Sequence, residues 1–479
     1  MPVLAFTGQS GRDADNEFAN SSRLINCYLE PLEGRVVLKT VLGAETLANL
    51  SDVFVRSLHA LGDEIYAVCN TSLYRITESG SVENVGTVAA GNTSMSRNTG
   101  ILTIASGGTY YTWTNSTSTL VAPTGAAFSD VGSVTFLGQY TVISEEDGRR
   151  FAWSAIADPA TFSGLDFATA ESRDDNILRV MALNGNLVIF KEESREVWYQ
   201  TGSADSTEAF QRLAGGVFDT GLRSYYLVAE MDHSAFFVGD DDIAYVTDGV
   251  QQRPVSNRAV ETAIAQGEPY RCVYYEDEGH KMACIIFTDR PAWCYDLATD
   301  KWHERTNDDV WNVVATERLN RKWYSATQSG VISKMIRNNN DNGVTLVREA
   351  VSNTLYQDGE LFTIAELELF ARVGRYELRR EETPTLSEGS AFFVDADGDG
   401  FAIPGTSVAS YPAQCSIQMS KDNGMTWGKE KFKSLGQIGD YDARINWRAL
   451  GQYRQATARL IWSEDGEISF RNEARVRLA

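Results

Sequence analysis

A short acidic motif near the C-terminus contains the residue types that bind cations. The segment Asp395–Gly400 places carboxylates at alternating positions, Asp395, Asp397 and Asp399. This spacing matches the first half of an EF-hand loop, whose calcium ligands are mostly carboxylate oxygens. The twelfth position, which needs a bidentate Glu, is Thr406. The motif therefore predicts either a weak calcium site or an exposed acidic turn.

A second motif, SKDNGMTW from Ser420 to Trp427, has the S-x-D-x-G-x-T-W pattern of an Asp-box. In such a hairpin Asp422 accepts hydrogen bonds from the turn, Gly424 permits a positive φ, and Trp427 covers the layer beneath. The motif occurs in sialidases and in many noncatalytic β-proteins, where it lies away from the catalytic centre. It therefore indicates a structural hairpin, not a reaction.

The remaining sequence shows no catalytic or metal-binding pattern. The six Cys form no CxxC pair and predict buried free thiols, and the four His form no HxH or HExxH spacing. GxSxG and P-loop motifs are also missing from the sequence. A sialidase-like glycosidase would need paired carboxylates or a Tyr nucleophile beside an arginine cluster. It would also usually repeat the Asp-box, which occurs once here. We predict no enzyme, no catalytic residue, no cofactor and no metal site other than the alternative of a weak calcium site at Asp395, Asp397 and Asp399.

The charge of the chain limits its partners. It has 43 Lys and Arg against 65 Asp and Glu, a formal net charge of −22. Residues 415–479 differ, with 11 basic and 8 acidic side chains. Nonspecific DNA binding depends on Lys and Arg that neutralise phosphates, whereas an acidic surface repels a polyanion. An ordinary nucleic-acid-binding function is therefore not expected.

A repeated unit organises most of the chain. A turn residue followed by an apolar β-run recurs every 38–47 residues. The turn residues are Gly62, Gly100, Gly138, Gly185, Asp232, Gly279 and Asn320. Four short antiparallel strands with their turns need roughly 40–50 residues, the length of one β-propeller blade. The sequence predicts an all-β fold with a six- to seven-bladed β-propeller, because strands from the chain ends could complete the first or last unit.

The elements that position these motifs follow from the repeat. The propeller is expected over residues 51–340. In its sixth unit, Tyr295 and Trp302 have the spacing of the outer hairpin of a blade, and we expect them to pack between neighbouring blades. Residues 1–50 and 341–479 contain further strand candidates, and the alternation of Leu367 and Leu369 with Glu366 and Glu368 predicts a half-buried strand among them. These two parts of the chain are expected to join into one β-rich platform module. A polar excursion interrupts its C-terminal part at about 372–412. One helix is expected near 257–266, with Ser256 as its N-cap.

The sequence contains no apolar run of the roughly 18–20 residues that a membrane-spanning helix needs. Its start lacks the basic region and the long apolar region of a secretory signal. Neither a membrane span nor a leader peptide is therefore expected.

Several segments resemble the packaged-DNA stabilisation proteins of short-tailed bacteriophages, which form the tail hub or nozzle. The segment RLINCYLE from Arg23 is similar to the family's R-x-x-N-x-Y-x-E pattern. Similar stretches lie at Ser194–Leu213, Gly239–Ile264 and Ile445–Arg454. Leu42 stands in place of the Pro of the family's P-G-L-like turn, and residues 372–412 have no counterpart.

The resemblance implies a noncatalytic virion protein of the tail, assembled in the cytoplasm of the bacterial host. It would form a ring, expected to be a homohexamer, below the portal and its adaptor ring. This ring would extend the DNA channel, help to retain and then release the genome without specific binding, and carry fibres, spikes or a plug. The alternative is a glycan-binding propeller adhesin of the tail, whose aromatic runs at Tyr110–Trp113 and Val197–Tyr199 would stack on sugars.

Overall fold

The structure, a computed structural model, describes residues 2–7, 22–32, 35–115, 119–203, 205–373, 413–435, 443–464 and 468–478. The chain forms two compact units. The first, here called the terminal unit, comprises Met1–Thr7, Leu29–Thr40 and Val347–Ala479. The second, here called the ring unit, comprises Gly8–Tyr28 and Val41–Leu346. Both are built almost entirely from strands, which confirms the all-β prediction.

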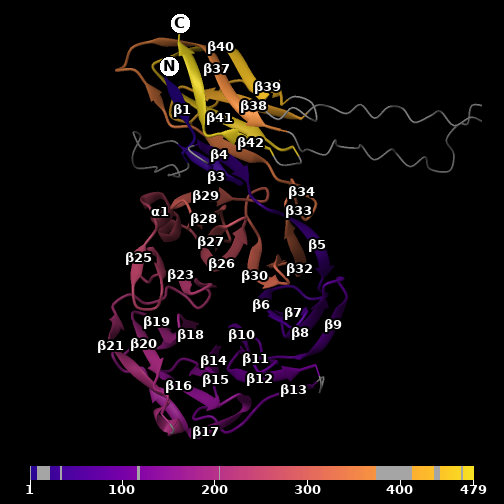
Figure 1. The fold of residues 1–479 in the computed structure, drawn as a ribbon, viewed down its shortest axis with the longest axis vertical. Coiled ribbons are helices and arrows are strands. Elements are labelled where there is room, and N and C mark those ends of the chain that lie inside the picture. The colour runs from indigo at the N-terminus through magenta and orange to yellow at the C-terminus, as the bar shows by residue number, and fades with distance from the viewer. Residues whose placement is uncertain are drawn as a thin grey trace, which may run out of the picture. The chain divides into compact units, whose positions relative to one another are not determined.

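The ring unit is a β-propeller of seven four-stranded blades (Figure 1). The first three blades are β6 (Val55–Leu61), β7 (Glu64–Cys69), β8 (Ser72–Thr77) and β9 (Val82–Thr87); β10 (Thr93–Asn98), β11 (Ile101–Ser106), β12 (Thr109–Thr114) and β13 (Thr119–Val121); and β14 (Val131–Leu137), β15 (Tyr140–Glu145), β16 (Arg150–Ala155) and β17 (Asp158–Thr169). The next two are β18 (Ile177–Leu183), β19 (Asn186–Lys191), β20 (Arg195–Gln200) and β21 (Phe210–Phe218); and β22 (Val228–Met231), β23 (Ser234–Val238), β24 (Ala244–Thr247) and β25 (Gln252–Pro254). The sixth blade is β26 (Pro269–Asp277), β27 (His280–Phe287), β28 (Ala292–Asp296) and β29 (Lys301–Arg305), and the seventh has β30 (Val313–Leu319), β31 (Lys322–Thr327) and β32 (Val331–Ile336).

The seventh blade takes its fourth strand from the N-terminal part of the chain. Strand β5 (Gly43–Asn49) pairs antiparallel with β32, with Ala48 opposite Ile332. The ring is therefore closed by hydrogen bonds between strands that are far apart in the sequence. Residues 1–50, expected together in the platform, are divided between the two units, because β5 belongs to the ring.

The seven turn residues of the sequence repeat mark the same turn in every blade. Each of the seven lies in the hairpin between a blade's first and second strands, and each has a positive φ, from 40° at Asp232 to 93° at Gly279. Such backbone conformations favour Gly, Asn and Asp. The spacing of these residue types therefore reports the length of each blade.

Smaller elements complete the ring unit. They are the strands β2 (Arg23–Ile25), β33 (Asn340–Asp341) and β34 (Val344–Thr345), the 3-10 helix η1 (Ser206–Glu208) and the helix α1 (Arg258–Gln266). The side chain of Asn257 accepts a hydrogen bond from the N–H of Val260, so Asn257, not Ser256, is the N-cap of α1. Strand β2 lies parallel to β29 at the edge of the sixth blade.

The terminal unit has two packed sheets that draw strands from both ends of the chain, as predicted. One sheet contains β1 (Val3–Ala5), β43 (Glu473–Leu478), β37 (Phe362–Arg372), β42 (Ser469–Arg471), β4 (Arg35–Thr40), β3 (Cys27–Leu32) and β40 (Ala443–Tyr453). The other contains β35 (Arg348–Val351), β36 (Leu355–Tyr356), β41 (Gln455–Trp462), β38 (Gln414–Ser420) and β39 (Lys431–Ser434). Trp462 and Phe470 meet between the sheets, with ring centroids 4.9 Å apart. Strand β37 alternates as expected, with Leu367 and Leu369 buried and Glu366 and Glu368 on the opposite face.

Candidate functional site

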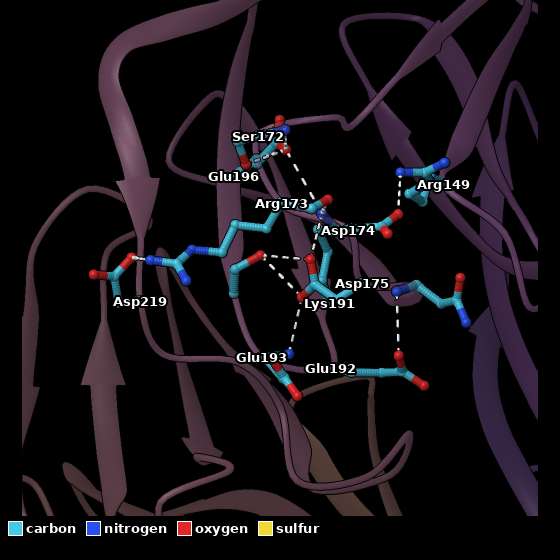
Figure 2. A network of polar contacts seen from close by, with 12 residues as sticks. Arg149, Ser172, Arg173, Asp174, Asp175, Lys191, Glu192, Glu193, Glu196 and Asp219 are labelled. Carbon is cyan, nitrogen blue, oxygen red and sulfur yellow. Dashed lines mark hydrogen bonds and ion pairs between the residues drawn. The ribbon is translucent and has the colours of Figure 1, made fainter.

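A network of buried charges joins the fourth blade to the connection that leads into it from the third blade (Figure 2). Lys191, the last residue of β19, has no exposed surface. Its Nζ lies 2.6 Å from Oδ1 of Asp175 and 3.9 Å from Oε1 of Glu196, and it donates to the carbonyl oxygen of Arg173 at 2.8 Å. Asp175 lies in the connection from blade three to blade four, so this cation fixes the connection against the fourth blade.

Both carboxylates of the network have further donors. Asp175 accepts from the N–H of Glu193 at 2.9 Å and from the Ser194 hydroxyl at 3.0 Å. Burial alone would raise the pKa of Asp175, but the hydrogen bonds from Lys191, Glu193 and Ser194 lower it overall. Glu196 accepts from the N–H of Ser172 at 2.9 Å. A buried ion pair with its oxygens satisfied in this way is costly to disrupt.

Arg195 is also fully buried, between the fourth and fifth blades. Its guanidinium lies over the rings of Phe218, Phe190 and Phe237, at 4.5, 5.9 and 5.5 Å from their centroids. Within the described residues its nitrogens have no hydrogen-bond partner. Burial lowers the pKa of Arg195 to about 10. The aromatic faces supply the attraction that replaces water around this cation.

The first strands of all seven blades line a central channel with a volume of about 630 Å³. Side chains of both signs line it, including Arg97, Arg179, Arg271, Glu230, Glu276 and Glu317. This volume is that of a small-molecule pocket. A cavity of this volume holds a small molecule and not a DNA duplex.

One acidic group in the channel has an unusual protonation equilibrium. Glu317 lies 3.8 Å from Nδ1 of His59, and the two side chains are 24% and 22% exposed. Burial and the nearby carboxylate of Glu230 raise the pKa of Glu317 to about 8, against the opposing effects of the Ala60 N–H and Arg97. Burial, assisted by Arg97, lowers the pKa of His59 to about 4. Near neutral pH the pair is therefore mostly uncharged.

This equilibrium predicts a pH-dependent stability. The pKa of Glu317 is higher in the folded state than in the unfolded state, so protonated Glu317 favours folding. Its contribution to the free energy of unfolding is present below about pH 4.5 and is lost as the pH rises through about 8. The Glu317→Gln variant should therefore match the wild type in melting temperature at pH 5 and exceed it at pH 9. Melting curves across this range test the expectation, with Glu45→Gln, an exposed residue of β5, as the control. An equal difference at both pH values would contradict it.

The Asp-box forms a braced hairpin in the terminal unit. The N–H of Gly424 donates to Oγ of Ser420 at 2.8 Å, and the N–H of Thr426 donates to Asp422 at 2.8 Å. Gly424 has φ +85°, and a Cβ there would lie 3.2 Å from the ring of Trp427. Trp427 is only partly buried, with the guanidinium of Arg459 over its ring at 4.7 Å. Its removal should therefore cost less than the ~3–5 kcal/mol of a fully buried aromatic side chain.

The hairpin predicts a second pH effect, of opposite sign. Burial alone would raise the pKa of Asp422, but hydrogen bonds from Thr426 and Ser420 lower it to about 2. The contribution of the ionised Asp422 carboxylate to the free energy of unfolding is therefore present above about pH 4 and lost as the pH falls through about 2. Asp422→Asn should lower the unfolding free energy by about 1 kcal/mol at pH 7 and by less at pH 2.5. Urea unfolding at both pH values measures this, and a constant difference would contradict it.

Tyr295 and Trp302 lie beside the preceding blade. Trp302 Nε1 donates to the carbonyl oxygen of Val255 at 2.8 Å, and its ring centroid lies 6.3 Å from that of Phe236 in the fifth blade. The Tyr295 hydroxyl accepts from Arg253 at 3.1 Å. These contacts cross from the sixth blade to the fifth.

The acidic motif and the cysteines are the subject of two further predictions from the sequence. The acidic motif at Asp395, Asp397 and Asp399 lies outside the described residues. Cys284 and Cys294, paired across β27 and β28, form a disulfide, so the prediction of free thiols is wrong for these two. Among the residues that the structure describes, no group of His, Cys, Asp and Glu could hold a metal ion, and no helix is long and apolar enough to cross a membrane.

The aromatic runs considered for sugar binding are mostly buried. Tyr110, Trp113 and Trp198 are 5%, 2% and 9% exposed, and Val197 is fully buried. Their rings therefore pack inside the propeller and leave little surface for stacking on a sugar.

The conspicuous residues of RLINCYLE fix the N-terminal segment to the sixth blade. Arg23 forms an ion pair with Glu304, and the side chain of Asn26 accepts from the N–H of Thr306 at 3.0 Å. The Tyr28 hydroxyl donates to Asp277 at 3.0 Å. The Ser194–Leu213 segment supplies Glu196 and Arg195 to the buried sites described above.

Sequence reasoning did not find the channel residues or the partner of Lys191. The channel residues could have been predicted from the repeat, because each strand that lines the channel directly precedes one of the seven turn residues. No comparable signal exists for Lys191, since Asp175 lies in an irregular connection whose path depends on how two blades pack.

Comparisons with known proteins give two family matches, one to each of two parts of the chain. The model of a family described as Bacteriophage P22 Gp10, beta-propeller, matches residues 34–342, and the model described as Bacteriophage P22 Gp10, beta-sandwich, matches residues 379–477. No curated protein matches the chain. Similar solved structures include the computationally designed Ika8 protein, with 13% identity over 61% of this chain and 99% of that one and a TM-score of 0.40. Another is the WD40 repeats of RRP9, with 9% identity over 62% and 99% and a TM-score of 0.43.

Proposed function

The chain belongs to the bacteriophage P22 Gp10 family, and from this premise we propose that it is a noncatalytic tail hub or nozzle protein that assembles into a homohexameric ring. The ring sits below the portal and its adaptor, extends the DNA channel, and helps to retain and then release the packaged genome. Membership itself makes the chain a structural protein of a phage tail with a β-propeller. The observation that carries the proposal is the pair of family matches, in chain order, over both units.

The dimensions of the ring unit support an assembly of several copies. The channel of one propeller holds about 630 Å³ and is lined by side chains, so DNA has no path through a single copy. A conduit for a duplex must therefore be enclosed by several chains. A closed ring of identical copies is a common way to enclose such a space.

The charge of the ring unit supports passage of DNA without adhesion. This unit has 25 Lys and Arg against 43 Asp and Glu. Where such a surface faces a lumen, it repels phosphates, so a duplex can slide without forming stable contacts. In this proposal the DNA is retained by the geometry of the assembly and not by binding.

The remaining parts of the proposal concern partners and location. The adaptor ring is the neighbour on the capsid side, and fibres, spikes or a plug are the neighbours on the far side. Assembly takes place in the cytoplasm of the bacterial host, and the finished location is the virion tail. The glycan-binding adhesin is less well supported, because its candidate aromatic residues are mostly buried.

Mass photometry of the purified chain, alone and with a portal–adaptor complex, tests the proposal. We expect a hexamer to form, either alone or on the adaptor. A chain that neither self-associates nor binds the portal–adaptor complex would contradict the proposal. A glycan array and a fluorogenic sialoside provide the comparison with an adhesin and a glycosidase, and we expect no signal in either assay.

A further inference from the structure

The outer face of one sheet of the terminal unit is rich in arginine. Strand β37 runs through it, with β40 on one side and β43 on the other. Glu366 of β37 lies between Arg448 and Arg477, and Glu368 lies opposite Arg475. Because side chains alternate across a strand, these residues share the face opposite the buried Leu367. The arginines of this face are Arg372, Arg444, Arg448, Arg471, Arg475 and Arg477.

Among the residues that the structure describes, only part of this positive charge is neutralised. Arg444 pairs with Glu368, and Arg448 pairs with Glu366 at 3.4 Å. Arg471 and Arg475 lie over the ring of Phe370, at 4.4 and 5.6 Å from its centroid. In the described part of the chain, Arg372, Arg471, Arg475 and Arg477 have no carboxylate within ion-pair distance. Counted over the described residues, the face therefore has more guanidinium groups than carboxylates that pair with them, and two of the guanidinium groups lie over an aromatic ring.

The chemistry of the face fits a protein surface rich in carboxylates. Guanidinium groups bind carboxylates in planar, two-pronged pairs, and Arg is enriched at protein interfaces. Glu366 and Glu368 stand among the arginines and give the face a mixed pattern of charge. A mixed pattern suits a partner with its own arrangement of charges better than it suits the uniform phosphates of DNA.

A complementary surface exists on the ring unit of the same chain. Turns between the second and third strands of each blade, and connections between blades, emerge on one face of a propeller. In the third to fifth blades these segments carry the exposed side chains of Glu171, Asp174, Glu192, Glu193, Asp219, Asp240 and Asp241. Figure 2 shows four of them, Asp174, Glu192, Glu193 and Asp219, around the buried Lys191 network. This set is here called the acidic loops. Asp174 and Asp219 pair with Arg149 and Arg173, whereas Glu192 and Glu193 form no ion pair with a described residue.

We infer that the arginine face of the terminal unit docks against the acidic loops of the ring unit of a second copy of this chain. The inference rests on the proposed ring and names the surfaces that would join its subunits. Two different surfaces of one chain meet in such a contact, so the contact is head-to-tail. A head-to-tail contact closes into a ring when the rotation between copies permits it.

Charge reversal in the full-length chain tests the inference. Arg475→Glu with Arg477→Glu should raise the concentration at half-assembly at least ~10-fold, as measured by sedimentation velocity. Lys429→Glu with Lys433→Glu is the matched control, because it makes the same change of charge in β39 of the other sheet and in the segment before it, and should leave assembly unchanged. The neutral pair Arg475→Gln and Arg477→Gln, with melting curves, separates a lost contact from a misfolded sheet.

A mixing experiment makes the test specific to the partner surface. Glu192→Lys with Glu193→Lys should also block assembly, and an equimolar mixture of this variant with the Arg475→Glu, Arg477→Glu variant should restore it. Wild-type rings that persist in the arginine variants would overturn the docking surface and leave the proposed function intact. A wild-type chain that never assembles would overturn both. Binding of a 30-base-pair duplex that is lost in the arginine variants would assign the face to DNA and also overturn the inference.

Discussion

Replacing Lys191 with Met is expected to lower the free energy of unfolding of the ring unit by about 3–5 kcal/mol. Lys191 is fully buried, and its Nζ is the cation that faces both Asp175 and Glu196. The substitution keeps most of the side-chain volume but leaves two buried carboxylates without this cation. Burying an uncompensated charge is far more costly than losing a surface ion pair. Urea unfolding followed by tryptophan fluorescence measures the change.

Two further variants make this prediction specific. Arg173→Met removes an ion pair with Asp219 whose side chains are 47% and 77% exposed, and its cost should be no more than about 1 kcal/mol. Adding Asp175→Asn and Glu196→Gln to Lys191→Met should recover part of the lost stability, because the orphaned charges are removed. If Lys191→Met were as mild as Arg173→Met, the network would not be what fixes the connection against the fourth blade.

Replacing Ala48 with Asp should open the ring at its closure. Ala48 is 6% exposed and packs with Leu50, Val55 and Ile332, from the closing strand and from the two blades that meet there. A carboxylate at this position would be buried among the hydrophobic side chains of this cluster, and we expect a loss of about 3–5 kcal/mol. Hydrogen exchange should show the change as faster exchange in β32 and β6, with a smaller effect in the third and fourth blades.

The neighbouring residue in the same strand is the matched control. Asn49 is exposed, so Asn49→Asp introduces the same charge on the solvent side of β5 and should change stability by less than about 0.5 kcal/mol. Equal protection of β32 in both variants would show that β5 does not hold the ring closed.

The sequence was sufficient to predict the propeller because the relevant signal is local. Each blade begins with a hairpin that needs a positive φ, and Gly62, Gly100 and their counterparts satisfy this need at regular intervals. The alternation of Leu367 and Leu369 with Glu366 and Glu368 likewise predicted a half-buried strand. In these cases the physical requirement lies within a few neighbouring residues, so it leaves a readable pattern.

The remaining features depend on contacts between distant parts of the chain. Strand β5 completes a blade whose other strands begin at Val313, and its own residues do not indicate this partner. The pairing of Lys191 with Asp175 depends on the path of a loop between blades. The arginine face appears only when β37, β40 and β43 are placed side by side. Such features need the three-dimensional arrangement, since residue types and spacing are the same in many other arrangements.

Cryo-electron microscopy of the assembled virion tail tests the central proposal most directly. The account predicts a ring of six copies of this chain below the portal and adaptor, enclosing a channel wide enough for a DNA duplex, with carboxylates prevailing on its wall. A tail in which the chain is absent from this position, or in which it occurs as isolated copies outside the channel, would contradict the account.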